Sequence, residues 1–399
     1  MKEEKVVKFR HKFTRKVIFP LIGIYVKLKS NIKIEKFKEV GKGPYLVLFN
    51  HQTGYDQFLV GLSFKFPLFY LASDDLLVNG IYSKIINYFA GIIPIKKNVT
   101  DVSAVKKCIK IAKEGGTIAI APEGNRTYSG ETCSFNPAIA SLIKTLNLPI
   151  VIYKIEGGYN VVSRWKDKPN KGKARAFVKR VIQKEEYENL TKSELCDKLA
   201  TELYNNDYNI NENYKGRRKA EYLERVAYVC PTCGLSEFKS IKNTIYCKKC
   251  KLAVEYLDDK SLKCTNAQFS FKNYLEWYNY QNQFINKLNL LDGSKLFYND
   301  QVKVYKVIPL KRKILLQKNA NLSLFNNKVE ILLKDGLMSM SFNEVDGVSV
   351  LGRNKLNIYF NGNVYQIKGD KRFNGVKYLN FYHRYNNQLK GVENEFLGL

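Results

Sequence analysis

The stretch of residues 45–56 reads YLVLFNHQTGYD and decides the fold. Its first half, Tyr45–Phe49, is an unbroken apolar run of strand length, which predicts a buried strand. A polar turn follows, in which His51 and Asp56 are separated by four residues. If a helical turn follows the strand, this spacing lets the Asp56 carboxylate reach the His51 imidazole. An imidazole whose Nδ1–H is held by a carboxylate presents Nε2 as a general base.

Three further apolar runs of strand length alternate with amphipathic stretches of helical period. The runs are Phe69–Ala72, Thr117–Ala121 and Ile150–Ile155, and the helical stretches include Ser103–Glu114 and Ala138–Leu146. Alternation of strands and helices is typical of an α/β fold. We therefore expect residues 38–206 to form an α/β domain, a sheet flanked by helices.

A second polar motif, Pro122-Glu123-Gly124-Asn125-Arg126, directly follows the run Thr117–Ala121. Gly124 permits a tight turn, and the planar guanidinium of Arg126 suits a phosphate group. Glu123 could orient Arg126 or bind a substrate hydroxyl. Taken alone, this motif favours a surface turn with a solvated ion pair.

The two motifs together, N-H-x4-D at Asn50–Asp56 and P-E-G-x-R at Pro122–Arg126, resemble those of the glycerolipid acyltransferases. Within that family they are most similar to the 1-acylglycerol-3-phosphate acyltransferases. The segment Gly91–Lys97 is similar to the family's third block, which normally ends in Arg, and Leu148–Val151 resembles the fourth. The resemblance covers roughly residues 20–200, about half of the chain.

The resemblance implies an enzyme of phospholipid biosynthesis. It would transfer a fatty-acyl group from acyl-coenzyme A or acyl-carrier-protein to the hydroxyl of lysophosphatidic acid, giving phosphatidic acid. His51 would be the catalytic base, and Asp56 would orient it. The family works without a covalent acyl-enzyme, so Cys133 is expected to be a structural thiol rather than a nucleophile.

The substrate-binding residues implied by the resemblance are Glu123, Gly124 and Arg126, which would hold the glycerol phosphate. Lys97 falls where the family has Arg. Lysine keeps the positive charge but loses the bidentate fork of arginine. A different lysolipid, or an amino-group acceptor, therefore stays open as an alternative.

Four of the eight cysteines form two C-x2-C pairs, Cys230 with Cys233 and Cys247 with Cys250, thirteen residues apart. This spacing resembles a zinc ribbon, in which four thiolates hold a structural Zn²⁺ in a closed tetrahedral site. The alternative is a ribbon that binds nucleic acid or protein, which the neighbouring lysines 248, 249 and 251 keep open. Because the sequence shows neither a disulfide framework nor a signal peptide, we expect a reducing compartment.

The charge balance is strongly basic, with 66 Lys and Arg against 37 Asp and Glu and a net charge of +29. Such an excess favours an anionic partner, either nucleic acid or a membrane surface. Residues 1–38 hold twelve Lys or Arg around the uncharged run Val17–Val26, which is too short to cross a bilayer because a spanning helix needs ~20 residues. We expect residues 1–37 to form a basic amphipathic segment at the membrane interface, on the cytoplasmic side of the cell membrane. The alternative is an ordinary packing helix.

Beyond residue 206 we expect a polar linker (207–228), the zinc ribbon (229–253) and a helical connector (254–300). Strands are predicted at Val302–Val307, Lys328–Leu333, Leu337–Phe342, Lys355–Phe360 and Val364–Ile367, with a hairpin turn at Asn361-Gly362 and a helix at Val376–Leu389. Strands in a meander with one terminal helix resemble the pleckstrin-homology shape, here over residues 301–392.

The whole pattern predicts a peripheral membrane acyltransferase with a structural zinc ribbon and a mainly-β carboxy-terminal domain. An alternative of another class is a non-catalytic zinc-ribbon protein that binds nucleic acid or partner proteins. In that alternative His51 is dispensable, and the basic residues converge on one groove.

Overall fold

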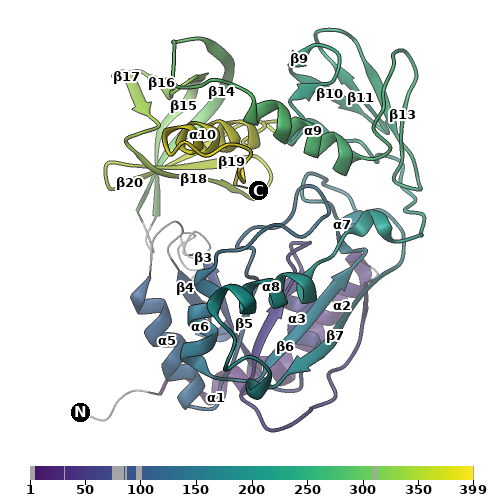
Figure 1. Ribbon diagram of the computed structural model, residues 1–399, viewed down its shortest axis with the longest axis vertical. Coiled ribbons are helices and arrows are strands. Elements are labelled where there is room, and N and C mark those ends of the chain that lie inside the picture. Colours follow the sequence, from purple (N-terminus) through teal and green to yellow (C-terminus); the bar gives the residue numbers. More distant parts are fainter. Residues whose placement is uncertain are drawn as a thin grey trace. The chain divides into compact units, whose positions relative to one another are not determined.

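The computed structural model describes residues 5–30, 32–73, 85, 88–95, 101–308 and 312–398 (Figure 1). The chain divides into two compact units. The first is built mainly from Met1–Ser163 and Lys171–Glu212, and the second from Arg164–Asn170, Asn213–Ile308 and Arg312–Leu399. Lys97, which the sequence places at the phosphate site, lies outside the described residues.

The first unit contains a seven-stranded mixed sheet. Its strands are β1 (Ile32–Ile34), β2 (Leu46–Phe49), β3 (Leu68–Ser73), β4 (Ile93–Ile95), β5 (Thr117–Ile120), β6 (Ile150–Glu156) and β7 (Ala174–Ile182), in the spatial order β1-β7-β6-β2-β5-β3-β4. The central strand β2 runs parallel to both of its neighbours, with Leu46 opposite Ile118 of β5 and Ile150 of β6. All four residues of β2 are buried, which explains its unbroken apolar sequence.

Two of the helices of the first unit begin at side-chain caps. The helices are α1 (Phe9–Phe13), a π-helical turn (Thr14–Ile18), α2 (Phe19–Ser30), α3 (Asp56–Ser63), α5 (Val102–Lys113), α6 (Ala138–Leu146), α7 (Gly158–Val161) and α8 (Lys192–Leu203), with 3-10 turns at Lys184–Glu186 and Asp207–Asn209. The Asp101 side chain accepts the Ala104 N–H and so begins α5, while Thr191 and Glu194 form a capping box at α8. No helix in the described ranges is long and apolar enough to span a membrane.

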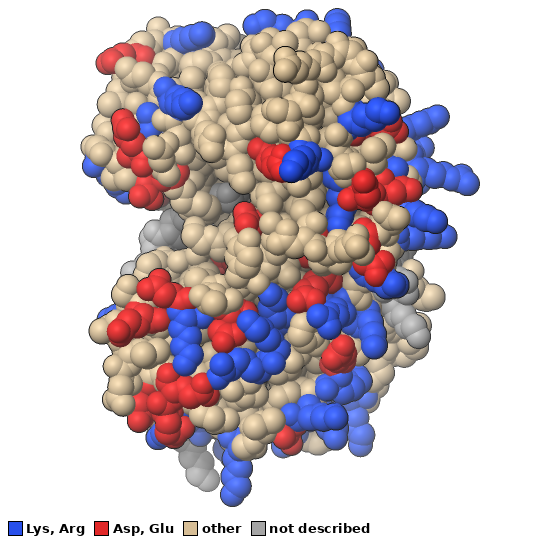
Figure 2. Space-filling view, turned by 45° about the vertical axis from the view of Figure 1, so that its right-hand side comes forward, with Lys and Arg blue, Asp and Glu red and all other residues tan. Residues whose placement is uncertain are grey.

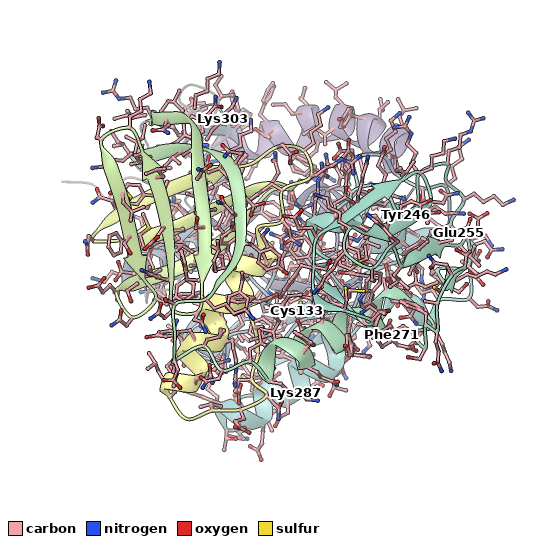
Figure 3. The ribbon with its side chains drawn as sticks, turned by 90° about the horizontal axis from the view of Figure 1, so that it is seen from above. Cys133, Tyr246, Glu255, Phe271, Lys287 and Lys303 are labelled. Carbon is pink, nitrogen blue, oxygen red and sulfur yellow. The ribbon has the colours of Figure 1, made fainter. Side chains whose placement is uncertain are left out.

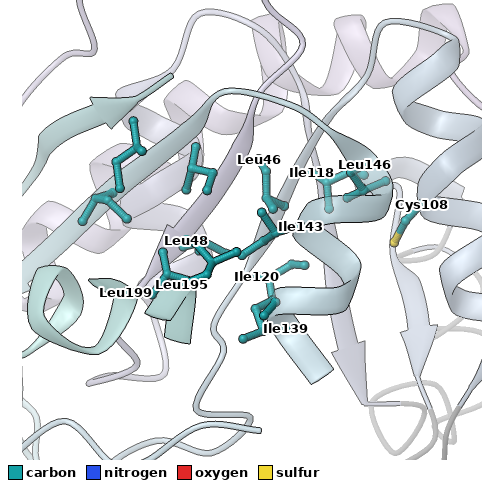
Figure 4. Close-up of a cluster of buried hydrophobic side chains, with 14 of the residues drawn as sticks. Leu46, Leu48, Cys108, Ile118, Ile120, Ile139, Ile143, Leu146, Leu195 and Leu199 are labelled. Carbon is teal, nitrogen blue, oxygen red and sulfur yellow. The ribbon is translucent and has the colours of Figure 1, made fainter. Parts of the chain in front are cut away.

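A cluster of aliphatic side chains fills the space between the sheet and the helices α5, α6 and α8 (Figure 4). Leu48 of β2 and Ile120 of β5 belong to it, together with Ile143 of α6 and Leu199 of α8. Burying a side chain of this size contributes roughly 1.5–3 kcal/mol. The cluster therefore fixes β2 and β5, the two strands that lead into the polar motifs.

The expected α/β class is confirmed for the first unit, and each of the four predicted strands overlaps an observed one. Strands β1, β4 and β7 are absent from the sequence-based prediction. β7 pairs with β6 in antiparallel fashion and carries exposed charges such as Arg175 and Arg180, so it lacks the apolar run of a buried parallel strand.

The second unit begins with a small all-antiparallel part that contains the four cysteines. It comprises β8 (Val229–Cys230), β9 (Gly234–Leu235), β10 (Phe238–Ile241), β11 (Thr244–Cys247), β12 (Ala253–Tyr256) and β13 (Leu262–Cys264), followed by α9 (Tyr274–Asn286). Strands β10 to β13 form one sheet in sequence order. Trp277 of α9 donates its Nε1–H to the carbonyl of Val229 at 2.9 Å, which ties the helix to the first cysteine pair. Residues 207–228, for which the sequence suggests a linker, contain a 3-10 turn at Leu223–Arg225 and a fully buried Val226.

The rest of the second unit is a half-barrel of seven antiparallel strands with a terminal helix. The elements are β14 (Leu296–Ile308), β15 (Arg312–Phe325), β16 (Lys328–Leu333), β17 (Gly336–Ser341), β18 (Val345–Leu351), β19 (Lys355–Phe360), β20 (Asn363–Lys368) and α10 (Val376–Leu389), and the strand order is β17-β16-β15-β14-β20-β19-β18. The five predicted strands and the terminal helix are confirmed, whereas β15 and β18 are not predicted. Asn361 and Gly362 join β19 to β20 with φ angles of 49° and 68°, the left-handed conformation that a two-residue hairpin turn requires.

Candidate active site

The turn between β2 and α3 brings His51 and Asp56 together, as the sequence predicts. Asp56 is the first residue of α3 and is fully buried. Its Oδ2 lies 2.8 Å from Nδ1 of His51, whose side chain keeps 24% of its surface exposed. The imidazole is therefore held from inside the protein while its other edge can meet a substrate.

The Asp56 carboxylate is surrounded by donors from the turn that precedes it. Oδ2 accepts the main-chain N–H of Gln52 at 2.6 Å, and Oδ1 accepts both the N–H and the hydroxyl of Thr53, at 2.9 and 2.6 Å. The first turn of α3 adds the positive end of a helix dipole. Because a carboxylate in this environment is an acceptor, Nδ1 of His51 donates to it, which leaves Nε2 as the basic nitrogen.

Glu123 of the second motif joins the two turns. Its Oε1 accepts the main-chain N–H of His51 at 2.7 Å, and its Oε2 accepts the N–H of Cys133 (labelled in Figure 3) at 2.9 Å. The carbonyl of His51 in turn accepts the N–H of Thr127 at 3.0 Å. Burial raises the pKa of Glu123 to about 8, an effect that the main-chain hydrogen bonds partly oppose and the charge of Asp56 increases. Both oxygens contact main-chain donors, so in this arrangement Glu123 positions the turn that carries His51.

Arg126 lies beside the same turn. A Cβ placed on Gly54 would come within 3.2 Å of the Arg126 Nη1, so the guanidinium packs directly against the segment between His51 and Asp56. Gly124 adopts a φ of 66°, and its N–H bonds to the carbonyl of Ala121, which closes the turn that carries Arg126. The structure thus brings together all of the predicted residues of this site except Lys97, which is not among the described residues.

Three polar residues of the site receive no role from the sequence: Asn50, which is only the first letter of the N-H-x4-D motif, Gln52 and Asp207. The amide of Asn50 exchanges two hydrogen bonds of 2.8 Å with the main chain of Ile155 on β6. Gln52 accepts the N–H of Tyr159 at 3.1 Å and donates to Asp207 at 3.3 Å. Asn50 and Gln52 flank His51, which is the one local signal that could have drawn attention to them.

Asp207 is fully buried and holds the loop after β6 against the turn that carries His51. Its carboxylate accepts the main-chain N–H groups of Gly157 and Tyr159, both at 2.9 Å, as well as the side-chain amides of Asn205 and Gln52. Burial raises the pKa of Asp207 from 3.8 to about 6, against the opposing effect of these hydrogen bonds. No pattern in the sequence connects this residue with a turn some 150 residues earlier.

The four cysteines of the second unit converge on one point. Their sulfur atoms all lie within 4.8 Å of one another, with 3.5 Å between Cys230 and Cys250 and 3.6 Å between Cys233 and Cys247. Four thiolates around a zinc ion at 2.3 Å would be about 3.8 Å apart, which matches these separations. The hydroxyl of Ser236 lies 3.0 Å from the Cys247 sulfur, as an outer-shell donor to a metal thiolate would. The cluster can therefore hold a metal ion with all four ligands from the protein.

Comparison with known proteins assigns the first unit. Residues 26–155, which include His51, Asp56, Glu123 and Arg126, match the family model described as Acyltransferase. These residues therefore form an acyltransferase domain. The match supports, over this part of the chain, the resemblance to the glycerolipid acyltransferases that the motifs predict.

Among solved structures, the chain is similar to the 1-acyl-sn-glycerophosphate (LPA) acyltransferase PlsC from Thermotoga maritima. The two share 18% sequence identity with a TM-score of 0.40, over 49% of this chain and 81% of that one. No curated protein matches the chain.

The raised pKa of Asp207 predicts a pH-dependent stability of the first unit. Between pH 3.8 and about 6 the folded protein keeps a proton that the unfolded chain has released, so the free energy of unfolding falls as the pH rises through this window. The contribution of Asp207 to this fall amounts to about 3 kcal/mol at most and is complete at about pH 6, whereas Glu123, with a pKa of about 8, adds a further fall in both the wild type and the variant. Since asparagine does not titrate, the variant Asp207→Asn should lack this slope.

Urea denaturation between pH 4 and 7, read by pulsed hydrogen exchange of peptides from β2 and β5, measures the effect. The informative quantity is the difference in slope between the wild type and Asp207→Asn. If the free energy of unfolding of the two proteins changed with pH in parallel, Asp207 would not be the group that causes the slope.

Proposed function

We propose that this protein transfers a fatty-acyl group from an acyl thioester to the free hydroxyl of lysophosphatidic acid, giving phosphatidic acid. The observation that carries the proposal is the buried Asp56 carboxylate bound to Nδ1 of a part-exposed His51, with the Arg126 guanidinium beside the same turn. A base and a phosphate-binding cation then lie within the span of one small glycerolipid. The donor is acyl-coenzyme A or acyl-carrier-protein.

The chemistry needs one proton transfer and one displacement. Nε2 of His51 removes the proton from the acceptor hydroxyl as that oxygen attacks the thioester carbonyl carbon. The new C–O ester bond forms, the C–S bond breaks, and the thiolate leaves and takes up the proton from the His51 imidazolium. A positioned general base is worth ~10²–10⁴ in rate, and the rest of the barrier is lowered by holding the two substrates in place. Arg126, together with Lys97, would neutralise the acceptor phosphate.

The amino-terminal helices support a peripheral association with an anionic membrane surface on the cytoplasmic side. Along α1, the π-helical turn and α2, large apolar side chains remain exposed at intervals of three or four residues: Phe9, Phe13, Val17, Leu21, Ile24 and Leu28. This spacing places them on one stripe of a helix. Lysines and arginines, such as Lys12 and Lys16, lie between them in the sequence and would meet anionic head groups.

The carboxy-terminal half-barrel supports a pleckstrin-homology-like domain in residues 301–392. A four-strand meander (β14 to β17), a three-strand meander (β18 to β20) and a helix after the last strand are the features that favour it. The nucleic-acid alternative has less support. On the face seen in Figure 2, Lys and Arg side chains are spread among Asp and Glu rather than gathered in one groove.

Acyl transfer is tested with purified protein, lysophosphatidic acid in anionic vesicles, and labelled acyl-coenzyme A or acyl-carrier-protein in separate reactions. We expect transfer with one of the two donors. His51→Ala should lower kcat by ~10²–10⁴, and Asp56→Asn should lower it by a smaller factor, because the imidazole remains but loses its fixed orientation. The matched control is His383→Gln, a histidine of the second unit, which should leave the rate unchanged.

Transfer only to other lysolipids would keep the enzyme class and reject the proposed acceptor. Full activity in His51→Ala, or no transfer by folded wild-type protein with any donor and acceptor, would refute the proposal.

Membrane association is tested by cosedimentation with anionic vesicles. The triple variant Leu21→Asn, Ile24→Asn, Leu28→Asn should bind at least tenfold more weakly, because each substitution removes apolar area that would enter the bilayer. A matched triple variant at exposed apolar positions of the second unit, Ile241→Asn, Leu332→Asn, Leu337→Asn, should bind like the wild type. Equal binding by the two triple variants would contradict the assignment of the stripe.

Zinc in the four-cysteine cluster is tested by metal analysis of the purified protein. We expect one Zn²⁺ per chain, retained until a strong chelator is added together with mild heat. Loss of the metal should lower the unfolding temperature of the second unit, because a segment this small depends on its metal for folding. Cys250→Ser should lower both zinc content and stability, while Cys264→Ser, a cysteine of the same sheet outside the cluster, should change neither.

A further inference from the structure

The second unit contains a polar cavity of about 260 Å³ that no part of the proposed acyl-transfer mechanism uses. One wall comes from the 3-10 turn at Leu223–Arg225, with Glu224, and from the cysteine-containing part, with Glu237 and Lys239. The other wall comes from the half-barrel, with Asp300, Arg372 and Lys377. Its volume lies just below the range of roughly 300–1,000 Å³ in which proteins bind drug-sized molecules. The cavity therefore fits a small solute or a single head group.

The charges that line the cavity balance. Lys377 pairs with Asp300 at 2.7 Å, Lys248 with Glu237 at 2.6 Å, and Arg372 with Glu224. Lys239 and Asp370 add one further charge of each sign. A cavity with equal numbers of both signs selects neither a simple anion nor a simple cation, whereas a ligand with both charges can satisfy both walls.

The Glu224 carboxylate is buried, and within the described part of the chain only one of its two oxygens is paired. The side chain keeps only 4% of its surface exposed, and its Oε1 accepts a hydrogen bond from Arg372. Its Oε2 is buried and has no hydrogen-bond partner among the described residues. A buried carboxylate oxygen without a donor costs about 1–3 kcal/mol or more, and because Glu224 lines the cavity, an N–H donor bound there would remove this cost.

A buried cation and an aromatic ring fix the geometry of the opposite wall. The Lys377 side chain is 4% exposed, and its Nζ lies 4.1 Å from the centre of the Tyr298 ring, whose hydroxyl bonds to the Tyr228 carbonyl at 3.0 Å. Lys239, in contrast, is exposed at the same cavity, and the Arg372 side chain is 38% exposed. These two cations are placed to meet an anionic group that enters from solvent.

We propose that this cavity binds a small zwitterion, with its ammonium group at Glu224 Oε2 and its anionic group at Lys239 and Arg372. Such a ligand occurs free in solution or as the head group of a zwitterionic phospholipid such as phosphatidylethanolamine. The shared chemistry is an ammonium and a phosphate joined by a short linker.

The test is equilibrium dialysis of the full-length protein with labelled glycerophosphoethanolamine. Saturable one-to-one binding is expected. Glycerol 3-phosphate and ethanolamine, which carry one charged group each, should each bind at least tenfold more weakly. Binding of either half as tightly as the whole, or no saturable binding of the whole, would overturn the proposal.

Two variants locate the site. Glu224→Gln removes the acceptor charge and should weaken binding at least tenfold, and Lys239→Gln, at an exposed position where folding is not at risk, should weaken it severalfold. The matched control is Glu255→Gln on β12 (labelled in Figure 3), a ribbon carboxylate that does not line the cavity, and it should bind like the wild type. Unchanged binding in both Glu224→Gln and Lys239→Gln would place the ligand elsewhere and overturn the proposal.

A competition arm identifies the source of the ligand. Phosphatidylethanolamine vesicles that displace the label, where phosphatidylglycerol vesicles do not, would assign a lipid head group. Label that stays bound in the presence of both vesicles would assign a free solute. None of these measurements depends on acyl transfer, so failure of the proposed reaction and failure of this binding site are told apart.

Discussion

The buried charge of Asp56 is the constraint on which the active site depends. A carboxylate removed from water costs several kcal/mol unless donors replace its hydration. Here the donors come from the three residues that precede it by three to five positions, His51, Gln52 and Thr53, and Asp56 lies at the positive end of the α3 dipole. The turn satisfies the carboxylate in this one conformation, and that conformation points the second nitrogen of His51 away from the carboxylate. The same interaction therefore shapes the loop and sets the chemistry of the base.

The order of the strands brings the other parts of the site to this turn. β5, β2 and β6 are adjacent and parallel, so the loops that follow them leave the same edge of the sheet. Ligand sites of open parallel sheets lie at this edge. Glu123 connects the loop after β5 to His51, and Asp207 connects the loop after β6 to Gln52. Two buried carboxyl groups with raised pKa values thus hold three loops in register around the base.

Sequence reasoning succeeded where the signal is local. Such local signals are the run Tyr45–Phe49, the spacing of His51 and Asp56, and the spacing within each cysteine pair. The structure shows the contact between His51 and Asp56 and the convergence of the four cysteines. Sequence reasoning failed where distant segments supply the partners. β7 carries exposed charges and so lacks the apolar run of a buried strand, and Asp207 bonds to a turn far away in the chain. The main-chain contacts of Glu123 also could not be predicted, because main-chain donors leave no trace in the residue types.

The most direct test of the account is the tautomer of His51, measured by ¹⁵N NMR on protein labelled at its three histidines, with His51→Ala for assignment. Near neutral pH the account predicts that His51 carries its proton on Nδ1, with Nε2 unprotonated. It also predicts that the strongly deshielded Nδ1 proton disappears in Asp56→Asn. A wild-type His51 protonated on Nε2 would contradict the account, because the nitrogen that faces the substrate could not then accept its proton.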